Sequence, residues 1–326
     1  MKSDYTRRDF LTHSSIVTLG AMIKFNPFDK AYLKRVQLGV ISYSFRSIPH
    51  DIDKLLQMCI DCNVNAIEMM GDPAETYAGK PANPVTFGPP PPGGQRQALT
   101  DDQKAQLAVY GKRVAEWRST VSMDKFKEIG SKFKNAGINI YAFKPNAFGP
   151  NNSDAEVDYA MNAADAMGAT SVTVELPTDP AQSKRLGDLG AKHKIFVGYH
   201  AHLQATDTLW DNALNQSPYN SINLDCGHYI AAGGPNTKET LLALIERKHD
   251  RITSMHLKDR LNKDHGGNNV EWGKGDTPIN EILQLMKSKK YTFPATVELE
   301  YEIPSGSDSV AEVKKCIAYA NKALSY

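Results

Sequence analysis

Histidine and carboxylate residues gather at the ends of short apolar segments in the second half of this 326-residue sequence. Segments 195–202, 221–228 and 252–259 are predicted to be β-strands, because they are short, apolar and rich in β-branched residues. The polar residues at or near their carboxyl ends are His200, His202, Asp225, His228, His256, Lys258 and Asp259. Imidazole and carboxylate groups on neighbouring strand ends are ligands for a divalent metal and groups that transfer protons.

Eight strand segments alternate with amphipathic helical stretches. The strands are predicted at 37–45, 66–70, 138–145, 171–177, 195–202, 221–228, 252–259 and 295–301. This strict alternation predicts an α/β fold in which a parallel sheet closes into a single (β/α)8 TIM barrel. An open doubly wound sheet would carry a glycine-rich phosphate loop after its first strand, and the segment Ser42–Arg46 lacks one. In a TIM barrel the carboxyl ends of the strands meet at one mouth, where active sites are built.

Alternation along the strands predicts which side chains face the barrel interior. Residues two apart on a strand point the same way, so His200 and His202 are expected to face one centre. In segment 297–301 the apolar residues are expected to face the helices, which leaves Glu298 and Glu300 facing inward. Glu175 has the same placement in its own strand. The mixed nitrogen and oxygen set favours Mn²⁺, Zn²⁺ or Co²⁺, and Mg²⁺ binds such sites more weakly.

Short sequence patterns predict where several helices start. Capping boxes pair Ser or Thr with Glu or Gln three residues later. Four segments fit or approach this pattern: Thr100–Gln103, Ser153–Glu156, Asn236–Glu239 and Ser309–Glu312.

The proline- and glycine-rich segment 71–94 follows the second strand, so it is expected to be a lid or wall at the mouth, with disorder as the alternative. Cys59 and Cys62 lie within a predicted helix, which favours buried thiols over a redox pair.

Composition argues against several classes of protein. The sequence has 38 Lys and Arg against 37 Asp and Glu, a net charge of +1. That balance disfavours a nucleic-acid-binding surface and a polybasic membrane patch. No run of about 18 apolar residues occurs, so no membrane span is expected in the mature protein. The sequence has no nucleotide-phosphate motif, so no organic cofactor is expected.

Residues 1–34 are predicted to be a targeting segment, which leaves 35–326 for the barrel. The segment Thr6–Leu11 contains the pair Arg7-Arg8, and a weakly apolar stretch at 16–23 follows. This pattern resembles a Tat export signal, which directs folded proteins across the bacterial inner membrane. The expected location is the periplasm, with anchoring if the segment is not cleaved. An ordinary basic N-terminus is the alternative interpretation.

The strand-end motifs resemble those of the xylose isomerase-like TIM barrel superfamily, over about residues 36–324. The segments that carry the resemblance are Tyr199–His202, Leu224–His228, His256–Asp259, Trp272–Asp276 and Val297–Glu300. This superfamily contains sugar isomerases and epimerases, inosose dehydratase-like enzymes and relatives of endonuclease IV. Together the motifs look like the exported sugar phosphate isomerase/epimerase proteins of Bacteroidetes-type bacteria.

The resemblance implies a divalent metal held by His200, Asp225, His256 and Glu298. The sequence departs from the family at His200, where most sugar epimerases carry a Glu that is both a metal ligand and an acid/base group. Glu175 on the neighbouring strand is the candidate for the missing carboxylate.

The resemblance also implies chemistry by proton abstraction next to a carbonyl, through an enediolate that the metal stabilises. Glu175 is the expected base, with a ligand role as the alternative, and Glu298 is expected to act in catalysis as well as in metal binding. His202 and His228 are candidates for the second acid/base group or for hydrogen bonding to substrate. Lys258 is expected to orient or neutralise a developing oxyanion.

Three further residues are predicted to bind substrate. Glu68 and Lys144, at the ends of the second and third strands, are expected to contact sugar hydroxyls, with a salt bridge across the mouth as the alternative. Trp272 is expected to stack on a sugar ring, with core packing as the alternative.

The leading functional hypothesis is a metal-dependent isomerase or epimerase acting on a keto-sugar or sugar derivative. If the second group protonates a leaving oxygen, the same site performs β-elimination, as a lyase or dehydratase on a 3-keto-glycoside or inosose. An abasic-site nuclease would need histidine ligands where Glu68 and Lys144 stand. The non-enzymatic alternative is an inactive sugar-binding barrel. Export favours an unphosphorylated carbohydrate as substrate, and a homodimer is the family-level expectation.

Overall fold

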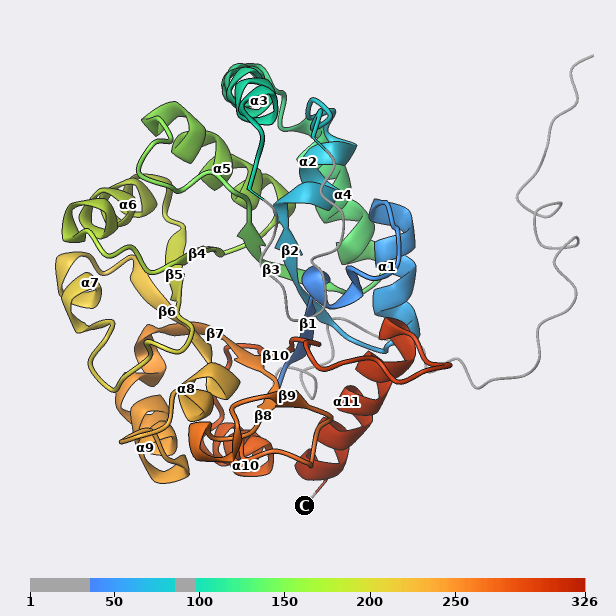
Figure 1. The fold of residues 1–326 in the computed structure, drawn as a ribbon, viewed down its shortest axis with the longest axis vertical. Helices are drawn as coiled ribbons and strands as arrows, with labels where there is room; N and C mark the ends of the chain where they lie inside the picture. Colours follow the sequence, from blue (N-terminus) through green and yellow to red (C-terminus); the bar gives the residue numbers. More distant parts are fainter. Residues whose placement is uncertain (1–35, 86–97, 326) are drawn as a thin grey trace, which may run out of the picture.

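Eight parallel strands close into a barrel in the computed structural model, which describes residues 36–85 and 98–325 (Figure 1). The strands are β1 (Leu38–Ile41), β2 (Ala66–Met70), β3 (Asn139–Lys144), β4 (Ser171–Glu175), β5 (Phe196–His200), β6 (Asn220–Asp225), β7 (Ile252–Leu257) and β10 (Ala295–Val297). Consecutive barrel strands pair in parallel, and β1 closes the ring against β10. The predicted single (β/α)8 barrel is confirmed. The targeting prediction for 1–34 lies outside the described residues.

Helices surround the sheet on its outer face (Figure 1). They are α1 (Ile52–Asp61), α4 (Asp124–Asn135), α5 (Asp154–Met167), α6 (Pro180–His193), α7 (Asp211–Gln216), α9 (Lys238–Lys248), α10 (Ile279–Lys289) and α11 (Ser309–Leu324). Additional helices α2 (Gly71–Tyr77) and α3 (Asp101–Thr120) follow β2, and α8 (Cys226–Ala232) follows β6. A short antiparallel pair, β8 (Asp259–Arg260) and β9 (Asn269–Val270), lies in the segment after β7. Within the described ranges, no helix is long and apolar enough to cross a membrane.

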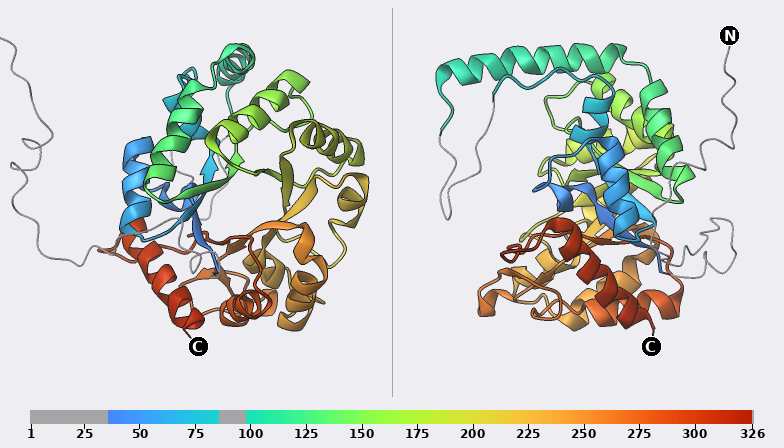
Figure 2. Two further views of the ribbon diagram at one scale, coloured as in Figure 1. Left: turned by 180° about the vertical axis from the view of Figure 1, so that it is seen from behind. Right: turned by 90° about the vertical axis from the view of Figure 1, so that its right-hand side faces the viewer.

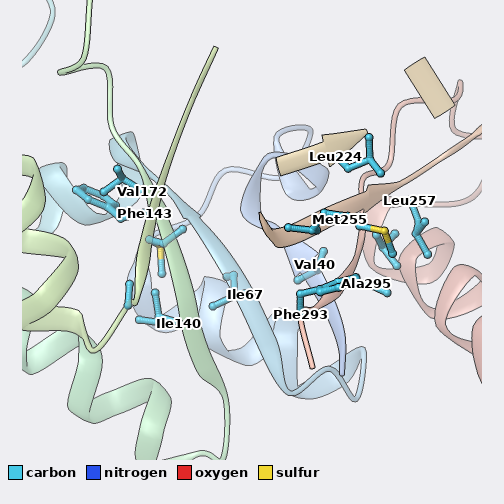
Figure 3. Packing of buried hydrophobic residues seen from close by; sticks show 14 of the residues in the cluster. Val40, Ile67, Ile140, Phe143, Val172, Leu224, Met255, Leu257, Phe293 and Ala295 are labelled. Carbon is cyan, nitrogen blue, oxygen red and sulfur yellow. The ribbon is translucent and has the colours of Figure 1, made fainter. Parts of the chain in front are cut away.

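The barrel core is built from strands that are buried along most of their length. Apolar side chains from strands around the ring are shown in Figure 3, among them Val40, Ile67, Val172, Leu224 and Met255. Parallel strands covered by helices bury both faces, which explains why they form nearly continuous apolar runs in the sequence. Cys59 and Cys62 are free and buried, as predicted. Burial raises the pKa of the Cys62 thiol to about 12, so it stays protonated.

Two of the four predicted helix caps are confirmed, and in the other two cases the capping residue differs by one position. α3 and α5 begin with the predicted capping boxes. Thr237 caps α9 in place of Asn236, whose side chain instead donates to two backbone carbonyls. Asp308 caps α11 in place of Ser309, which is the first helical residue. Ser, Thr, Asp and Asn are all favoured at the N-cap position. Where two of them are adjacent, either can cap the helix, and the spacing to the next Glu or Gln does not decide which one does.

The predicted long loop 71–94 is partly helical, which corrects the sequence prediction. α2 begins directly after β2 at Gly71, while residues 86–97 lie outside the described part. The chain then forms the 20-residue helix α3, whose amino-terminal half projects beyond the rest of the barrel (Figure 2). Val114 and Arg118, in its carboxy-terminal half, are its buried residues.

A buried cluster of charged groups fastens α3 to its neighbours. Arg118 Nη2 lies 3.0 Å from Glu75 Oε1 on α2, and Arg118 Nη1 lies 3.2 Å from Glu156 Oε1 on α5. Lys80 Nζ lies 2.9 Å from the other oxygen of Glu75. Because buried charges are tolerated only when they are paired, this cluster fixes where α3 leaves the barrel surface.

Substitution of Arg118 by methionine is expected to lower the free energy of unfolding by about 3 kcal/mol, because Glu75 and Glu156 lose a buried cation. The matched control is Arg113→Met, at an exposed position of the same helix, with an expected change under about 0.5 kcal/mol. Urea denaturation followed by circular dichroism measures both variants. Equal stability of the two variants would show that the cluster does not anchor α3.

Candidate active site

The carboxyl ends of four neighbouring strands bring the proposed metal ligands together. His200 and Asp225 are the last residues of β5 and β6, His256 is next to last in β7, and Glu298 directly follows β10. His200 Nε2 lies 4.0 Å from Asp225 Oδ2, and His256 Nδ1 lies 3.9 Å from the same oxygen. Glu298 Oε2 lies 2.9 Å from His256 Nδ1. All four residues are buried, so they form one enclosed cluster at the barrel mouth.

Hydrogen bonds behind the cluster orient its ligand atoms. His200 Nδ1 lies 2.8 Å from Asn223 Oδ1, and His256 Nε2 lies 2.8 Å from Glu68 Oε2. Both partners are acceptors, so these ring nitrogens donate, which turns His200 Nε2 and His256 Nδ1 toward the cluster. Asp225 is held in a similar way: its Oδ1 caps α8 by accepting from the backbone N–H of His228 at 2.7 Å, which leaves Oδ2 for the cluster.

Three ligand atoms of the cluster lack a hydrogen-bond partner among the described residues: Asp225 Oδ2, His256 Nδ1 and Glu298 Oε2. Nearby charges reach them at ion-pair distance but without hydrogen-bond geometry. Buried polar atoms without partners are costly. Ligand atoms of His200, Asp225 and His256 all lie within 4.8 Å of one another. This donor set fits a divalent metal with mixed nitrogen and oxygen ligands.

The two ligand histidines differ in protonation. Burial, with the nearby charge of Lys144, lowers the pKa of His200 to about 4, so its ring is neutral at pH 7. Burial also opposes charge on His256, but Glu298 and Glu68 outweigh that effect and raise the pKa of His256 to about 10. A metal bound at this cluster would therefore displace a proton from His256, as is usual for histidine ligands.

Lys258 is a buried cation beside the metal-ligand candidates. Its Nζ lies 3.0 Å from Asp225 Oδ2, 2.8 Å from Glu298 Oε2 and 2.6 Å from Glu300 Oε2. Burial opposes its charge, but the carboxylates hold the pKa of Lys258 well above the usual value. Lys258 is therefore a permanent positive charge that limits the repulsion among these carboxylates.

A second group of predicted residues lies at the more exposed rim of the mouth. Glu175 contacts His202 through Oε2, at 3.2 Å from Nε2, and Lys144 through Oε1, at 3.3 Å from Nζ. The His202 ring centroid lies 4.9 Å from that of His200 and 4.5 Å from that of His228. Burial opposes ionisation of Glu175, but His202, His200 and Lys144 hold its pKa well below the usual value. The bond to Glu175 raises the pKa of His202.

His228 connects this rim to two cations. Its Nε2 lies 3.3 Å from Lys258 Nζ, and its Nδ1 lies 2.6 Å from Arg260 Nη1. Burial, only partly offset by Asp225, lowers the pKa of His228 to about 4, which keeps the ring neutral between the two cations. Arg260 was missed in the sequence, although its position two residues after Lys258 is a signal that the two residues share a face.

Glu68 lies inside the barrel, below the mouth where a substrate would bind. It is fully buried, and its Oε2 also lies 3.2 Å from the Tyr141 hydroxyl and 3.3 Å from Asn223 Nδ2. The structure therefore places Glu68 behind His256 rather than at the mouth. Asn223, which contacts both His200 and Glu68, was also missed. Its position two residues before Asp225 on β6 gives it the same face and could have revealed it.

Trp272 lies apart from these two groups and packs against α11. Its ring meets that of Tyr319 edge-on, with centroids 5.9 Å apart. The adjacent loop is held by Asp259, whose Oδ2 accepts from the backbone N–H groups of Gly273 at 2.7 Å and Gly275 at 2.9 Å. Asp259 thus orders this loop, whereas stacking of Trp272 on a sugar remains a prediction.

Residues 105–320 match the family model of the xylose isomerase-like TIM barrel. The match covers more than half of the sequence, and the chain belongs to this family. No curated protein matches the sequence at a significant level.

Solved structures with this fold include proteins of different activities. One is a sugar phosphate isomerase/epimerase from Parabacteroides distasonis, at 17% identity and a TM-score of 0.54, with 89% of this chain and 95% of that chain covered. Another is the 3-keto-D-glucoside 4-epimerase from E. coli, at 10% identity and a TM-score of 0.56, with 88% of this chain and 100% of that chain covered. A third is the probable 3-DHS dehydratase from Bacillus anthracis, at 13% identity and a TM-score of 0.57, with 86% of this chain and 98% of that chain covered. At these identities the likeness shows the fold alone.

Metal affinity tests the cluster directly. Glu298→Gln is expected to weaken Mn²⁺ binding by at least about 100-fold, because loss of a ligand should cost no less than loss of a group that orients one. Glu302→Gln, an exposed position four residues further on, is the matched control and should bind Mn²⁺ like the wild type. Isothermal titration calorimetry measures the affinities. Equal Kd values for the two variants would remove Glu298 from the ligand set.

Proposed function

We propose that this chain is a divalent-metal-dependent enzyme that removes a proton next to the carbonyl of a keto-sugar and acts as an isomerase or epimerase. The observation that carries the proposal is the enclosed cluster of His200, Asp225, His256 and Glu298 at the barrel mouth, in which ligand atoms of the first three lie within 4.8 Å of one another. A divalent ion bound there would supply a Lewis acid that polarises the substrate carbonyl.

The order of strands supports a reaction that uses both faces of the substrate. β7, β6 and β5 separate β10 from β4 on one side of the eight-stranded ring, so β4 and β10 stand on opposite sides. Glu175 ends β4 and Glu298 follows β10. A ring bound at the mouth therefore has one carboxylate on each side, as epimerisation needs one group to remove the proton and another to return it.

The rim residues would hold and transfer the proton. Glu175 stays ionised, so its carboxylate accepts the proton from carbon. His202, whose Nε2 lies 3.2 Å from Glu175 Oε2, holds that carboxylate in position. The ammonium of Lys144 faces the same space and donates to substrate oxygens. Lys258 holds Glu298 and Glu300 in place through its own contacts.

A second candidate is β-elimination from a 3-keto-glycoside, as a lyase. It is favoured by the hydrogen bond between His202 and Glu175, which keeps a proton on Nε2 at the rim, where a leaving oxygen would lie. The neutral His200, in place of the family's glutamate, also removes one acid/base group that an epimerase would use. We further propose export to the periplasm, which favours a free or glycosidic keto-sugar over a sugar phosphate.

Turnover in D₂O distinguishes the candidates. Mn²⁺-loaded protein incubated with 3-keto-glucose and 3-keto-glycosides is expected to yield a stereoisomer with deuterium at the exchanged carbon, as observed by NMR. Glu175→Gln is expected to lower kcat by about 100-fold or more, the typical contribution of a positioned base. Glu302→Gln serves again as the control with unaltered kcat.

Three other results of this experiment would contradict parts of the proposal. Release of the aglycone with an unsaturated keto product would replace the epimerase proposal with the lyase. Absence of both solvent exchange and turnover with Mn²⁺, Zn²⁺ and Co²⁺ would overturn the enzymatic proposal on these substrates and favour a sugar-binding barrel. Equal kcat values for Glu175→Gln and wild type would exclude Glu175 as the base.

A further inference from the structure

A polar cavity of about 420 Å³ lies between α2, α3 and the end of β3. Its volume is within the range of small-molecule sites. The lining includes Asp72, Lys80, Tyr110, Gly111, Lys144 and Asn146. Part of the lining comes from α3, the helix that projects past its neighbours (Figure 2).

Lys144 connects this cavity to the candidate active site. It lines the cavity, and its Nζ lies 3.3 Å from Glu175 Oε1, which in turn contacts His202 through Oε2 at 3.2 Å. A ligand in the cavity would therefore lie beside the same Lys144 that faces the metal cluster. Lys144 is thus common to the cavity and to the rim of the candidate active site, so a molecule bound in the cavity would end beside the reacting groups.

The charges of the lining point to a neutral polar ligand. Three cations, Lys80, Arg118 and Lys144, are matched by three carboxylates, Asp72, Glu75 and Glu156. Most of them are paired with one another and so are fixed in position. Such a wall offers donors and acceptors without net charge, which suits hydroxyl groups because each hydroxyl both donates and accepts. A phosphate would need a net positive site.

Gly111 lines the cavity at a cost to its own helix. A glycine within a helix is about 1 kcal/mol less favourable than alanine. No positive φ requires glycine at this position, and an added Cβ would meet no atom within 4 Å. Neither backbone conformation nor packing explains the residue. Beside it on the same cavity wall, Tyr110 offers an aromatic surface.

We propose that this cavity is a subsite for the second sugar unit of a two-part substrate, a glycoside whose keto-sugar ring reacts at the metal cluster. This inference rests on the proposed function and adds to it the class of substrate. The paired charges and asparagine side chains bind hydroxyl groups of the second unit, and Tyr110 contacts its ring.

A variant that fills the cavity tests the proposal. Gly111→Met is expected to lower the ratio of kcat/KM for 3-keto-cellobiose to kcat/KM for 3-keto-glucose by at least about tenfold, since a blocked subsite loses contacts only with the longer substrate. Val109→Met, a 60% exposed position on the other face of α3, is the matched control and should keep the wild-type ratio. Thermal unfolding should show that Gly111→Met is at least as stable as the wild type. An unchanged ratio in Gly111→Met would overturn the subsite.

Binding without turnover separates this inference from the proposed function. Saturation-transfer NMR with unoxidised cellobiose and glucose is expected to show stronger binding of cellobiose by the wild type and loss of that preference in Gly111→Met. If the preference is present but no keto-sugar reacts, the proposed reaction fails and the subsite stands. If the wild type shows no preference for cellobiose while 3-keto-glucose is turned over, the subsite fails and the reaction stands.

Discussion

His256 lies between two carboxylates inside the barrel, and the arrangement of the site depends on this contact. Its Nε2 faces Glu68 on β2 and its Nδ1 faces Glu298 after β10, at 2.8 and 2.9 Å. The hydrogen bond to Glu68 and the contact with Glu298 together hold the ring, so the position of Nδ1 is set by the backbone of three strands. Burial makes the contacts strong, because no water competes for these atoms. The ligand geometry is therefore a property of the barrel itself and not of its loops.

The departure at His200 changes the charge of the cluster. A neutral His200 stands where the resemblance implies a carboxylate, and the buried ammonium of Lys258 lies beside Asp225 and Glu298. Both residues make the cluster less negative than three carboxylates and one histidine would be alone. A less negative cluster attracts a divalent cation more weakly but also polarises a bound carbonyl more strongly, because the ligands neutralise less of the ion's charge.

The sequence predicted the barrel well, because the alternation of strands and helices follows from periodicity. It placed several strand ends too late: the strand predicted at 221–228 ends at Asp225, and His228 lies in α8. Alternation with period two placed Glu298 and Glu300 on one face, and the structure has both in contact with Lys258. Contacts between distant strands could not be predicted in this way. Glu68 was expected at the mouth, but its strand meets β3 with a shift in register next to Glu68, and the side chain lies behind His256.

Helix boundaries and loop content were predicted less well for a different reason. Adjacent capping residues such as Asn236 and Thr237 have similar intrinsic preferences, and tertiary hydrogen bonds decide between them. Likewise, the prolines of segment 71–94 indicated a loop, yet Pro73 lies in the first turn of α2, where its missing N–H costs nothing.

The attachment of α3 has an evolutionary consequence. One end of the helix is fixed by Arg118 and its two carboxylates, whereas Tyr110 and Gly111 lie two turns away on a part that carries no barrel contacts of similar strength. Mutations in that part can accumulate with little penalty to folding and without disturbing the reacting groups. Under the proposed subsite, the preference for a second sugar unit can therefore change by exchange of a few residues of one surface helix, while the metal-ligand candidates inside the barrel stay the same.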